Sequence, residues 1–321
     1  MRNIRVGARG SHLSKIQSEL VIDQLRSLYS NIDFSFVPIK TQGDNLAAQP
    51  TFELGVKGLF VKEIEMALQK KQIDLAVHSA KDLASDLPED LVVCPALARA
   101  EPWDVLVTVT KLNFNLLAKR STIGTSSLRR QAFLNVYRPD LILKPLRGNV
   151  GTRLRAVGTQ FTGVILAQAA LSRLNANLGN LKTEVLPKTI LPPAPGQGQL
   201  AFEYRRSDHF MEEFLKPLYH LPSALAFYAE RAFVRELGIG CSEAISALAN
   251  FDSSGELRLE AAKIINGQVI KVEKSITIPL TVQLIKNGRV NWGKKDIGPA
   301  EFAQAENLGK MVASSLKARK S

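Results

Sequence analysis

The chain has 321 residues, of which 45% are hydrophobic and 22% are charged, and its formal net charge at pH 7 is +12. This size and composition exclude a disordered or fibrous protein and predict a globular chain of two or three domains. No run approaches the roughly 20 apolar residues of a membrane-spanning helix, and two cysteines exclude a disulfide framework. We expect no leader peptide and a reducing cytoplasmic location.

The first ninety-odd residues alternate strand and helix patterns. Ser11 is a candidate cap for the first helix, whose apolar residues recur at helical spacing. Strands are expected at 4–8, 33–39 and 75–79, and helices at 13–28 and 61–71. This alternation predicts an α/β sheet domain.

From about residue 98 the α/β pattern restarts and becomes basic. Residues 98–197 carry 14 Lys and Arg against 4 Asp and Glu, a net of +10 within a chain total of +12. Strands are expected near 105–109, 141–144 and 164–166, and helices at 127–137, after Asn149, and around Arg173. The sequence therefore predicts a second α/β domain that holds most of the excess positive charge.

Two stretches of this basic segment, 124–130 and 147–155, place glycine or hydroxyl residues where a helix begins and follow them with arginines. Free backbone N–H groups and fixed positive charge together favour an anion site. A nucleic-acid surface is the alternative, but the arginines stand in Gly/Ser/Thr turns without interleaved aromatic residues. Arginine in such turns suits carboxylates or phosphate.

A proline- and glycine-rich segment at 191–199 indicates a crossing point or hinge between two lobes. A strand is expected after it at 200–204. A third, smaller α/β domain is expected from a helix at 222–237, strands at 245–250, 257–265 and 269–278, and a helix at 300–315. The predicted domains are residues 1–97 with 198–217, residues 98–197, and residues 218–321.

The two cysteines stand in different settings. Cys94 lies in an apolar run and is expected to be a small buried hydrophobe. Cys241 follows Gly238 and Gly240 after a long helix, where other groups can approach its sulfur closely. On these grounds Cys241 is either a structural cysteine or a reactive thiol.

Several charged residues have ordinary explanations when taken singly. Asp82, just beyond the third strand, is then a loop or cap carboxylate, and Lys57 is a lysine in a glycine turn without phosphate-loop spacing. The spacing on the helix at 222–237 favours surface ion pairs among Glu230, Arg231, Arg235 and Glu236.

Taken in order, the motifs change this interpretation. They run from Lys57–Glu63 and Val77–Asp82 through Gly124–Gln131 and Leu146–Arg153 to Gly196–Gly198 and Ala229–Phe233 before Gly240 and Cys241. Together they closely resemble the porphobilinogen deaminase family, over at least residues 4–245. The resemblance implies an enzyme that condenses four porphobilinogen molecules head to tail into hydroxymethylbilane and releases ammonia. It also implies a dipyrromethane cofactor bound by a thioether to Cys241. No metal is expected, because the two cysteines and four histidines show no zinc-site spacing.

The resemblance further implies an α/β fold with two lobes like periplasmic binding proteins around a cleft, plus a C-terminal domain that carries the cofactor cysteine. Asp82 matches the catalytic aspartate. Implied cofactor contacts besides Cys241 are Lys81, Asp82, Thr125, Ser126, Ser127, Arg129, Arg130, Arg147 and Gly148. Implied substrate contacts are Arg9, Ser11, Lys57, Arg153, Arg173 and Gln197.

We expect a monomer that acts on a small molecule, without nucleic acid or membrane. Two other classes stay open: a two-lobed binding protein that closes on a carboxylated ligand without chemistry, and a nucleic-acid binder that uses the basic segment.

Overall fold

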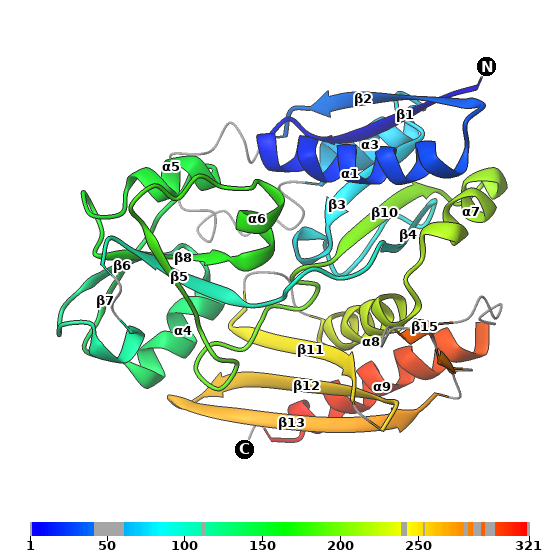
Figure 1. The fold of residues 1–321 in the computed structure, drawn as a ribbon. Coiled ribbons are helices and arrows are strands. Elements are labelled where there is room, and N and C mark those ends of the chain that lie inside the picture. The colour runs from blue at the N-terminus through cyan, green and yellow to red at the C-terminus, as the bar shows by residue number, and fades with distance from the viewer. Residues whose placement is uncertain are drawn as a thin grey trace.

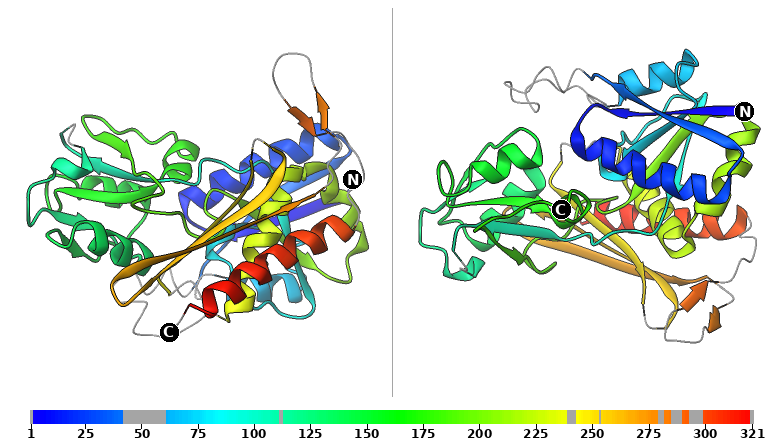
Figure 2. Two further views of the ribbon diagram at one scale, coloured as in Figure 1. Left: turned by 90° about the horizontal axis from the view of Figure 1, so that it is seen from below. Right: turned by 45° about the horizontal axis from the view of Figure 1, so that its top comes forward.

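Two five-stranded sheets and one three-stranded sheet form the framework of the chain (Figures 1 and 2). The computed structural model describes residues 2–41, 61–110, 113–238, 243–252, 254–278, 282–284, 290–292 and 299–319. The α/β fold expected from the sequence is confirmed, and none of the helices within these ranges is both long and apolar enough to cross a membrane.

The first sheet has the strand order β2-β1-β3-β10-β4. Its strands are β1 (Arg2–Arg9), β2 (Ile32–Ile39), β3 (Leu75–Ser79), β4 (Leu91–Ala96) and β10 (Leu200–Arg205). Its helices are α1 (His12–Leu28), α3 (Lys62–Gln69) and α7 (His209–Leu215), and a short 3-10 turn, Ala80–Asp82, follows β3. Val21 and Leu25 of α1 pack on Ile4, Val6 and Phe202 of the sheet, so the period-3.6 and period-2 apolar faces meet in one core.

The second sheet has the order β7-β6-β8-β5-β9. Its strands are β5 (Asp104–Thr108), β6 (Thr122–Gly124), β7 (Ile142–Lys144), β8 (Gly163–Ala167) and β9 (Lys182–Val185). Its helices are α4 (Leu128–Tyr137), α5 (Val150–Arg155) and α6 (Gln168–Arg173), with a 3-10 turn at Phe114–Leu116.

The two five-stranded sheets share one topology. In each, three parallel strands are followed by an antiparallel strand in the fourth position, β10 in the first sheet and β5 in the second. These are the strands through which the chain enters the second lobe and returns to the first. Two crossing segments, residues 97–103 and 186–199, therefore join the lobes (Figure 1). The first leads into β5 and the second into β10, and each of these strands lies next to the middle strand of its sheet.

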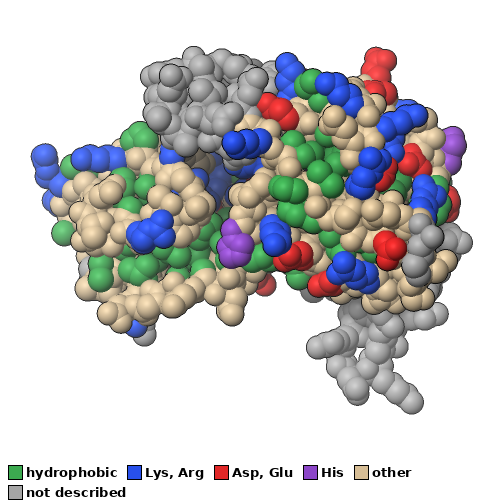
Figure 3. Space-filling model, turned by 90° about the horizontal axis from the view of Figure 1, so that it is seen from above, with side chains coloured by type: hydrophobic (Ala, Val, Ile, Leu, Met, Phe, Trp, Pro, Cys, Tyr) green, Lys and Arg blue, Asp and Glu red, His purple; other side chains and the backbone are tan. Residues whose placement is uncertain are grey.

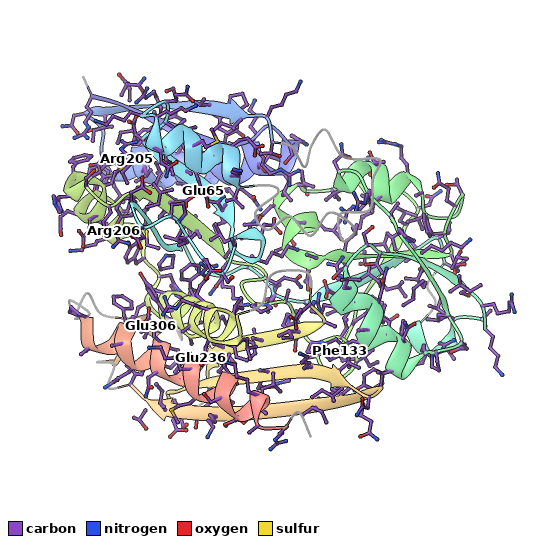
Figure 4. The ribbon with its side chains drawn as sticks, turned by 180° about the vertical axis from the view of Figure 1, so that it is seen from behind. Glu65, Phe133, Arg205, Arg206, Glu236 and Glu306 are labelled. Atoms are coloured by element: carbon purple, nitrogen blue, oxygen red, sulfur yellow. The ribbon has the colours of Figure 1, made fainter. Side chains whose placement is uncertain are left out.

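The third part packs two helices against an antiparallel sheet. Helices α8 (Leu221–Leu237) and α9 (Pro299–Lys317) cover one face of β11 (Ile245–Phe251), β12 (Glu256–Ile265) and β13 (Gln268–Thr277). A 3-10 turn (Lys216–Leu218) precedes α8, and β14 (Val282–Leu284) pairs with β15 (Val290–Trp292). Phe133 of α4 points toward this sheet (Figure 4) and shares a core with Ile264 and Val269, so the third part is also fastened to the second lobe.

Helix α1 confirms the expected cap, because the Ser11 Oγ accepts a hydrogen bond from the Ser14 N–H at 3.2 Å. Strands β4, β6 and β9 and helix α7 were not anticipated. Strand β4 contains Pro95 and lies at the sheet edge, where a missing N–H is tolerated. Cys94 is buried there, as expected.

Helices α8 and α9 approach so closely that Gly309 has no room for a side chain. A Cβ at this position would lie 2.2 Å from the Ala229 carbonyl oxygen and 2.8 Å from the Phe233 nitrogen. Substitution Gly309→Ala must therefore push the helices apart, and we expect it to lower the free energy of unfolding by about 1–3 kcal/mol.

Chemical denaturation of the two proteins measures this difference. Ser314→Ala on the exposed face of α9 is the matched control and should leave the midpoint unchanged. A Gly309→Ala protein as stable as the control would contradict the close packing.

Candidate active site

The candidate site residues follow the carboxyl ends of parallel strands in both lobes. Arg9 ends β1, Lys81 and Asp82 follow β3, and the turns after β6, β7 and β8 supply the candidates of the second lobe. Open α/β sheets place their ligand sites at such ends. In the space-filling view, Lys and Arg side chains are visible inside a hollow between the lobes (Figure 3).

Two adjacent arginines at the start of α4 share one buried carboxylate. Arg129 Nη2 lies 2.5 Å from Asp104 Oδ2, and Arg130 Nη2 lies 2.6 Å from Asp104 Oδ1. The carboxylate has no exposed surface, and both arginines are buried. Burial alone would raise the pKa of Asp104, but the charges and hydrogen bonds of the two arginines hold it well below its ordinary value. The trio carries a net charge of +1.

The arginines also bind the backbone of neighbouring segments. Arg129 Nη1 donates to the Pro192 carbonyl in the crossing segment, and Arg130 Nη1 donates to the Ile165 carbonyl of β8 at 2.8 Å. The Nε of each arginine is buried without a hydrogen-bond partner in the described structure. Burial lowers the pKa of Arg129. Each guanidinium thus has an Nε–H donor left over after its structural contacts.

The turn Ala80–Asp82 brings opposite charges to the cleft. The Asp82 side chain is exposed, whereas Lys81 is half-buried. Burial lowers the pKa of Lys81, while the negative charge of Asp82 acts in the opposite direction, and the charge of Arg130 adds to the lowering. The turn of the first lobe is therefore within electrostatic reach of the arginines of the second.

Arg153 of α5 interacts electrostatically with the same group of charges. Burial and the nearby charge of Arg130 together lower its pKa to about 10, against the opposing charge of Asp82. Arg147 and Arg9 also contribute to the lowering. At neutral pH all these arginines remain cationic. The structure thus brings together Arg9, Lys81, Asp82, Arg129, Arg130, Arg147 and Arg153, which we call the cleft charge cluster.

The candidate hydroxyl residues mainly shape the turns. Ser127 Oγ caps α4 by accepting from the Arg130 N–H, and Ser126 Oγ exchanges hydrogen bonds with the backbone of Leu146. Thr125 is buried, and its Oγ1 accepts from the Ser127 N–H at 3.3 Å. These contacts fix the geometry of the turn between β6 and α4.

The second basic turn is built in the same way. Gly148 has a φ of +101°, and its carbonyl accepts from Arg153 Nε at 2.8 Å. The Asn149 side chain caps α5. Arg147, together with Thr152 and Arg155, lines a cavity of about 390 Å³. Ser11 belongs to the first lobe, where it caps the start of α1.

Two further candidates lie at the crossing segments. Arg173 Nη2 donates to the Gly198 carbonyl at 2.6 Å, and burial lowers its pKa to about 10. Gln197 Nε2 donates to the Pro102 carbonyl at 2.6 Å and to Asp104 Oδ1 at 3.1 Å. Both residues therefore tie the crossing segments to the second lobe.

Lys57 and Cys241 lie outside the described residues. Cys241 is placed by its chain position: α8 ends at Leu237, and Gly238 caps it in the left-handed conformation at a φ of +67°. The cysteine follows three residues later.

The surface pairing expected on α8 is wrong for Glu230 and Arg231. Glu230 is 1% exposed and pairs with Arg99 of the first crossing segment at 2.6 Å. Arg231 donates to backbone carbonyls of the first lobe. The other two pair with α9 instead of with each other, Arg235 with Glu306 at 3.4 Å and Glu236 with Lys317 at 3.1 Å.

Asp104 and Arg99 were not among the candidate residues. A signal existed for Asp104, because a carboxylate that opens an apolar strand within a basic segment must be paired when it is buried. Arg99 offered no comparable pattern, since its partner lies 131 residues away.

Comparison with known proteins gives consistent results. Residues 4–213 match the family described as "Porphobilinogen deaminase, dipyromethane cofactor binding domain". The porphobilinogen deaminase of Thermus thermophilus is 42% identical over 261 residues, 81% of this chain and 84% of that protein. That of Syntrophotalea carbinolica is 39% identical over 317 residues, 98% of this chain and 93% of that protein.

Solved structures also match. The BenM effector-binding domain with its effector benzoate has a TM-score of 0.45 and 13% identity, over 70% of this chain and 94% of that one. The Bordetella pertussis BvgS periplasmic VFT2 domain has a TM-score of 0.42 and 15% identity, over 72% of this chain and 92% of that one.

Removing the charge of Asp104 should destabilise the protein strongly. Asp104→Asn keeps the shape but leaves two buried guanidinium groups without a counter-charge, so we expect a loss of about 3–5 kcal/mol in the free energy of unfolding. Denaturation curves at pH 7 measure it. Asp23→Asn, which removes the exposed partner of Arg26, is the control and should not shift the midpoint. Equal stability of both variants would contradict the role given to Asp104.

Proposed function

Since the chain belongs to the porphobilinogen deaminase family, we propose that Cys241 carries its dipyrromethane cofactor and that Asp82 is its catalytic residue. The protein is a transferase that condenses four porphobilinogen molecules head to tail into hydroxymethylbilane and releases ammonia. When bound, the dipyrromethane supplies the pyrrole end to which the first substrate unit is added.

The cleft charge cluster is the observation that supports these assignments. Each pyrrole unit carries an acetate and a propionate, so a growing chain accumulates carboxylates and needs several cations in one place. Six cations and one carboxylate converge at the cleft. Asp104 neutralises only part of this positive charge, because it pairs with Arg129 and Arg130 alone. We assign carboxylate binding to Arg9, Lys81, Arg129, Arg130, Arg147, Arg153 and Arg173, supported by Ser11, Lys57, Thr125, Ser126, Ser127, Gly148 and Gln197. A charge-assisted contact contributes about 1.5–3 kcal/mol.

Asp82 is the one carboxylate of the cluster that is exposed to the cleft. An ionised carboxylate there accepts hydrogen bonds from pyrrole N–H groups and balances positive charge that develops as the amine leaves. It is also placed to take up or deliver a proton during this departure.

We also propose the unit boundaries near residues 97, 197 and 217, because the chain changes sheets between β4 and β5 and between β9 and β10. The cluster is assembled within one chain, which supports a monomeric enzyme that acts on small molecules. Cys94 is a free thiol. The Cys241 thiol must also be reduced before it can bind the cofactor, and both points support a reducing, cytoplasmic location.

Intact-mass spectrometry tests the tether. We expect the purified protein to be heavier than its sequence by two pyrrole units, and Cys241→Ser to have the mass of the bare chain. Cys94→Ser is the matched control and should keep the adduct, because burial raises the pKa of the Cys94 thiol to about 12 and makes it a poor nucleophile.

An unmodified wild-type chain that stays unmodified with porphobilinogen would instead support a binding protein without chemistry. Salt-sensitive affinity for oligonucleotides without any adduct would favour a nucleic-acid binder.

Substitution of Asp82 tests the catalytic assignment. Asp82→Asn removes the charge but keeps the shape, so kcat should fall by about 100-fold or more. Asp82→Glu keeps the charge and should lose less activity. Glu89→Gln in the same exposed loop is the control and should be unaffected. Near-normal turnover by Asp82→Asn would remove Asp82 from the mechanism.

A further inference from the structure

The turn that carries Asp82 rests on helix α8 of the third part. Phe227 of α8 is 2% exposed and packs with Ala80 and Leu83, the residues at either end of the turn. Val61 and Ala201 of the first lobe complete this small core. The base of the turn is therefore built partly from a helix that begins about 140 residues later in the sequence.

One helical turn after Phe227, Arg231 reaches the other end of the same segment. Its Nη1 donates to the Ala84 carbonyl at 2.6 Å, and its Nη2 reaches the Ser85 carbonyl at 3.4 Å. A planar guanidinium with two parallel donors can hold two successive carbonyl groups, which a single ammonium cannot do with the same geometry. Arg231 thus fixes the backbone two and three residues beyond Asp82.

The residue before Arg231 acts on the opposite side of the turn. Glu230 Oε2 accepts from the Gly196 N–H at 2.6 Å, and Gly196 has a φ of +73°. A Cβ on Gly196 would lie 2.9 Å from both the Ala80 carbonyl carbon and the Lys81 nitrogen, so the glycine backbone lies directly against the turn. Two consecutive residues of α8 are therefore linked to the turn, Glu230 through Gly196 at its start and Arg231 to the backbone just beyond its end.

Beside the Arg231 contact there is space into which the segment could move. A cavity of about 410 Å³ is lined by Ser85, Leu87, Tyr228, Arg231 and Glu306, and its lining includes no member of the cleft charge cluster. Glu306 and Glu236 mark the α8–α9 pair in Figure 4. Ser85 is buried on one side and lines this cavity on another, so the two hydrogen bonds from Arg231 add to the packing that holds residues 84 and 85.

Helix α8 also leads directly to Cys241, three residues after its cap at Gly238. We propose that Arg231 is a positioning residue, which fixes the Asp82 turn to helix α8, the helix that precedes the proposed cofactor cysteine in the sequence. This inference rests on the proposed function. It means that the position of the catalytic carboxylate depends on helix α8 of the third part as well as on its own lobe.

Loss of Arg231 should affect turnover and substrate binding differently. A misplaced Asp82 slows the chemical steps, because a displacement of about 1 Å can cost roughly 100-fold in rate. The arginines that bind carboxylates are held by other contacts, so substrate affinity should remain. Loss of Arg231 should therefore lower kcat much more than it changes KM.

The experiment uses holoenzyme whose cofactor content is verified by intact mass. We expect Arg231→Ala to lower kcat for porphobilinogen consumption by about 10- to 100-fold with KM within about 3-fold of wild type. Arg231→Lys, which keeps the charge and one donor, should recover part of kcat. Arg235→Ala removes the half-exposed arginine one turn later on α8 and is the matched control, with kcat unchanged.

Three results would overturn the proposal: a loaded Arg231→Ala enzyme with wild-type kcat, a fall in kcat matched by Arg235→Ala, or a rise in KM that accounts for the loss. If Arg231→Ala does not fold, Arg231→Lys decides, because full kcat in that variant would show that the two-carbonyl contact is dispensable. Failure of the proposed function is distinguishable, since the wild-type chain itself would then lack the adduct and release no ammonia.

Discussion

The structure depends on the pairing of Asp104 with Arg129 and Arg130. A cleft for a polyanionic chain needs guanidinium groups in its wall, and two adjacent buried arginines would repel each other without a counter-charge. Asp104 supplies that charge from the first position of β5, where the chain enters the second lobe. The same carboxylate accepts from Gln197 in the returning segment. One buried carboxylate thus stabilises the two charged arginines in the cleft wall and ties both crossing segments to helix α4.

A second buried carboxylate does the corresponding work for the third part. Glu230 binds Arg99 of one crossing segment, the Gly196 N–H of the other, and the Ala249 N–H of β11 at 2.7 Å. All of these donors converge on a side chain with 1% exposure, so its charge is fully satisfied. The two lobes and the third part therefore meet at a junction of fixed geometry.

The sequence predicted the features that depend on neighbouring residues and missed the contacts between residues far apart in the chain. Caps such as Ser11 and Ser127 and the alternating strands depend on neighbouring residues, so their patterns were readable. The site residues could be named because their motifs, taken in order, resemble those of a known family, whereas Asp82 and Lys57 taken singly had ordinary explanations. Glu230 looked like a surface residue because nothing on its own helix reveals a partner 131 residues away. The edge strand β4 was not predicted, and it contains Pro95, which only the sheet order shows to be tolerated at an edge.

The insertion of the second lobe into the first has a consequence for synthesis on the ribosome. Strand β10 lies between β3 and β4, so the first sheet cannot close until residues 200–205 have left the exit tunnel. The five strands of the second sheet all lie between residues 104 and 185 and can pair earlier. At about 5–20 residues per second, β3 and β4 wait roughly 5–20 s with unpaired edges. The nascent chain therefore presents a binding opportunity for chaperones that recognise exposed strands before the enzyme's first lobe exists.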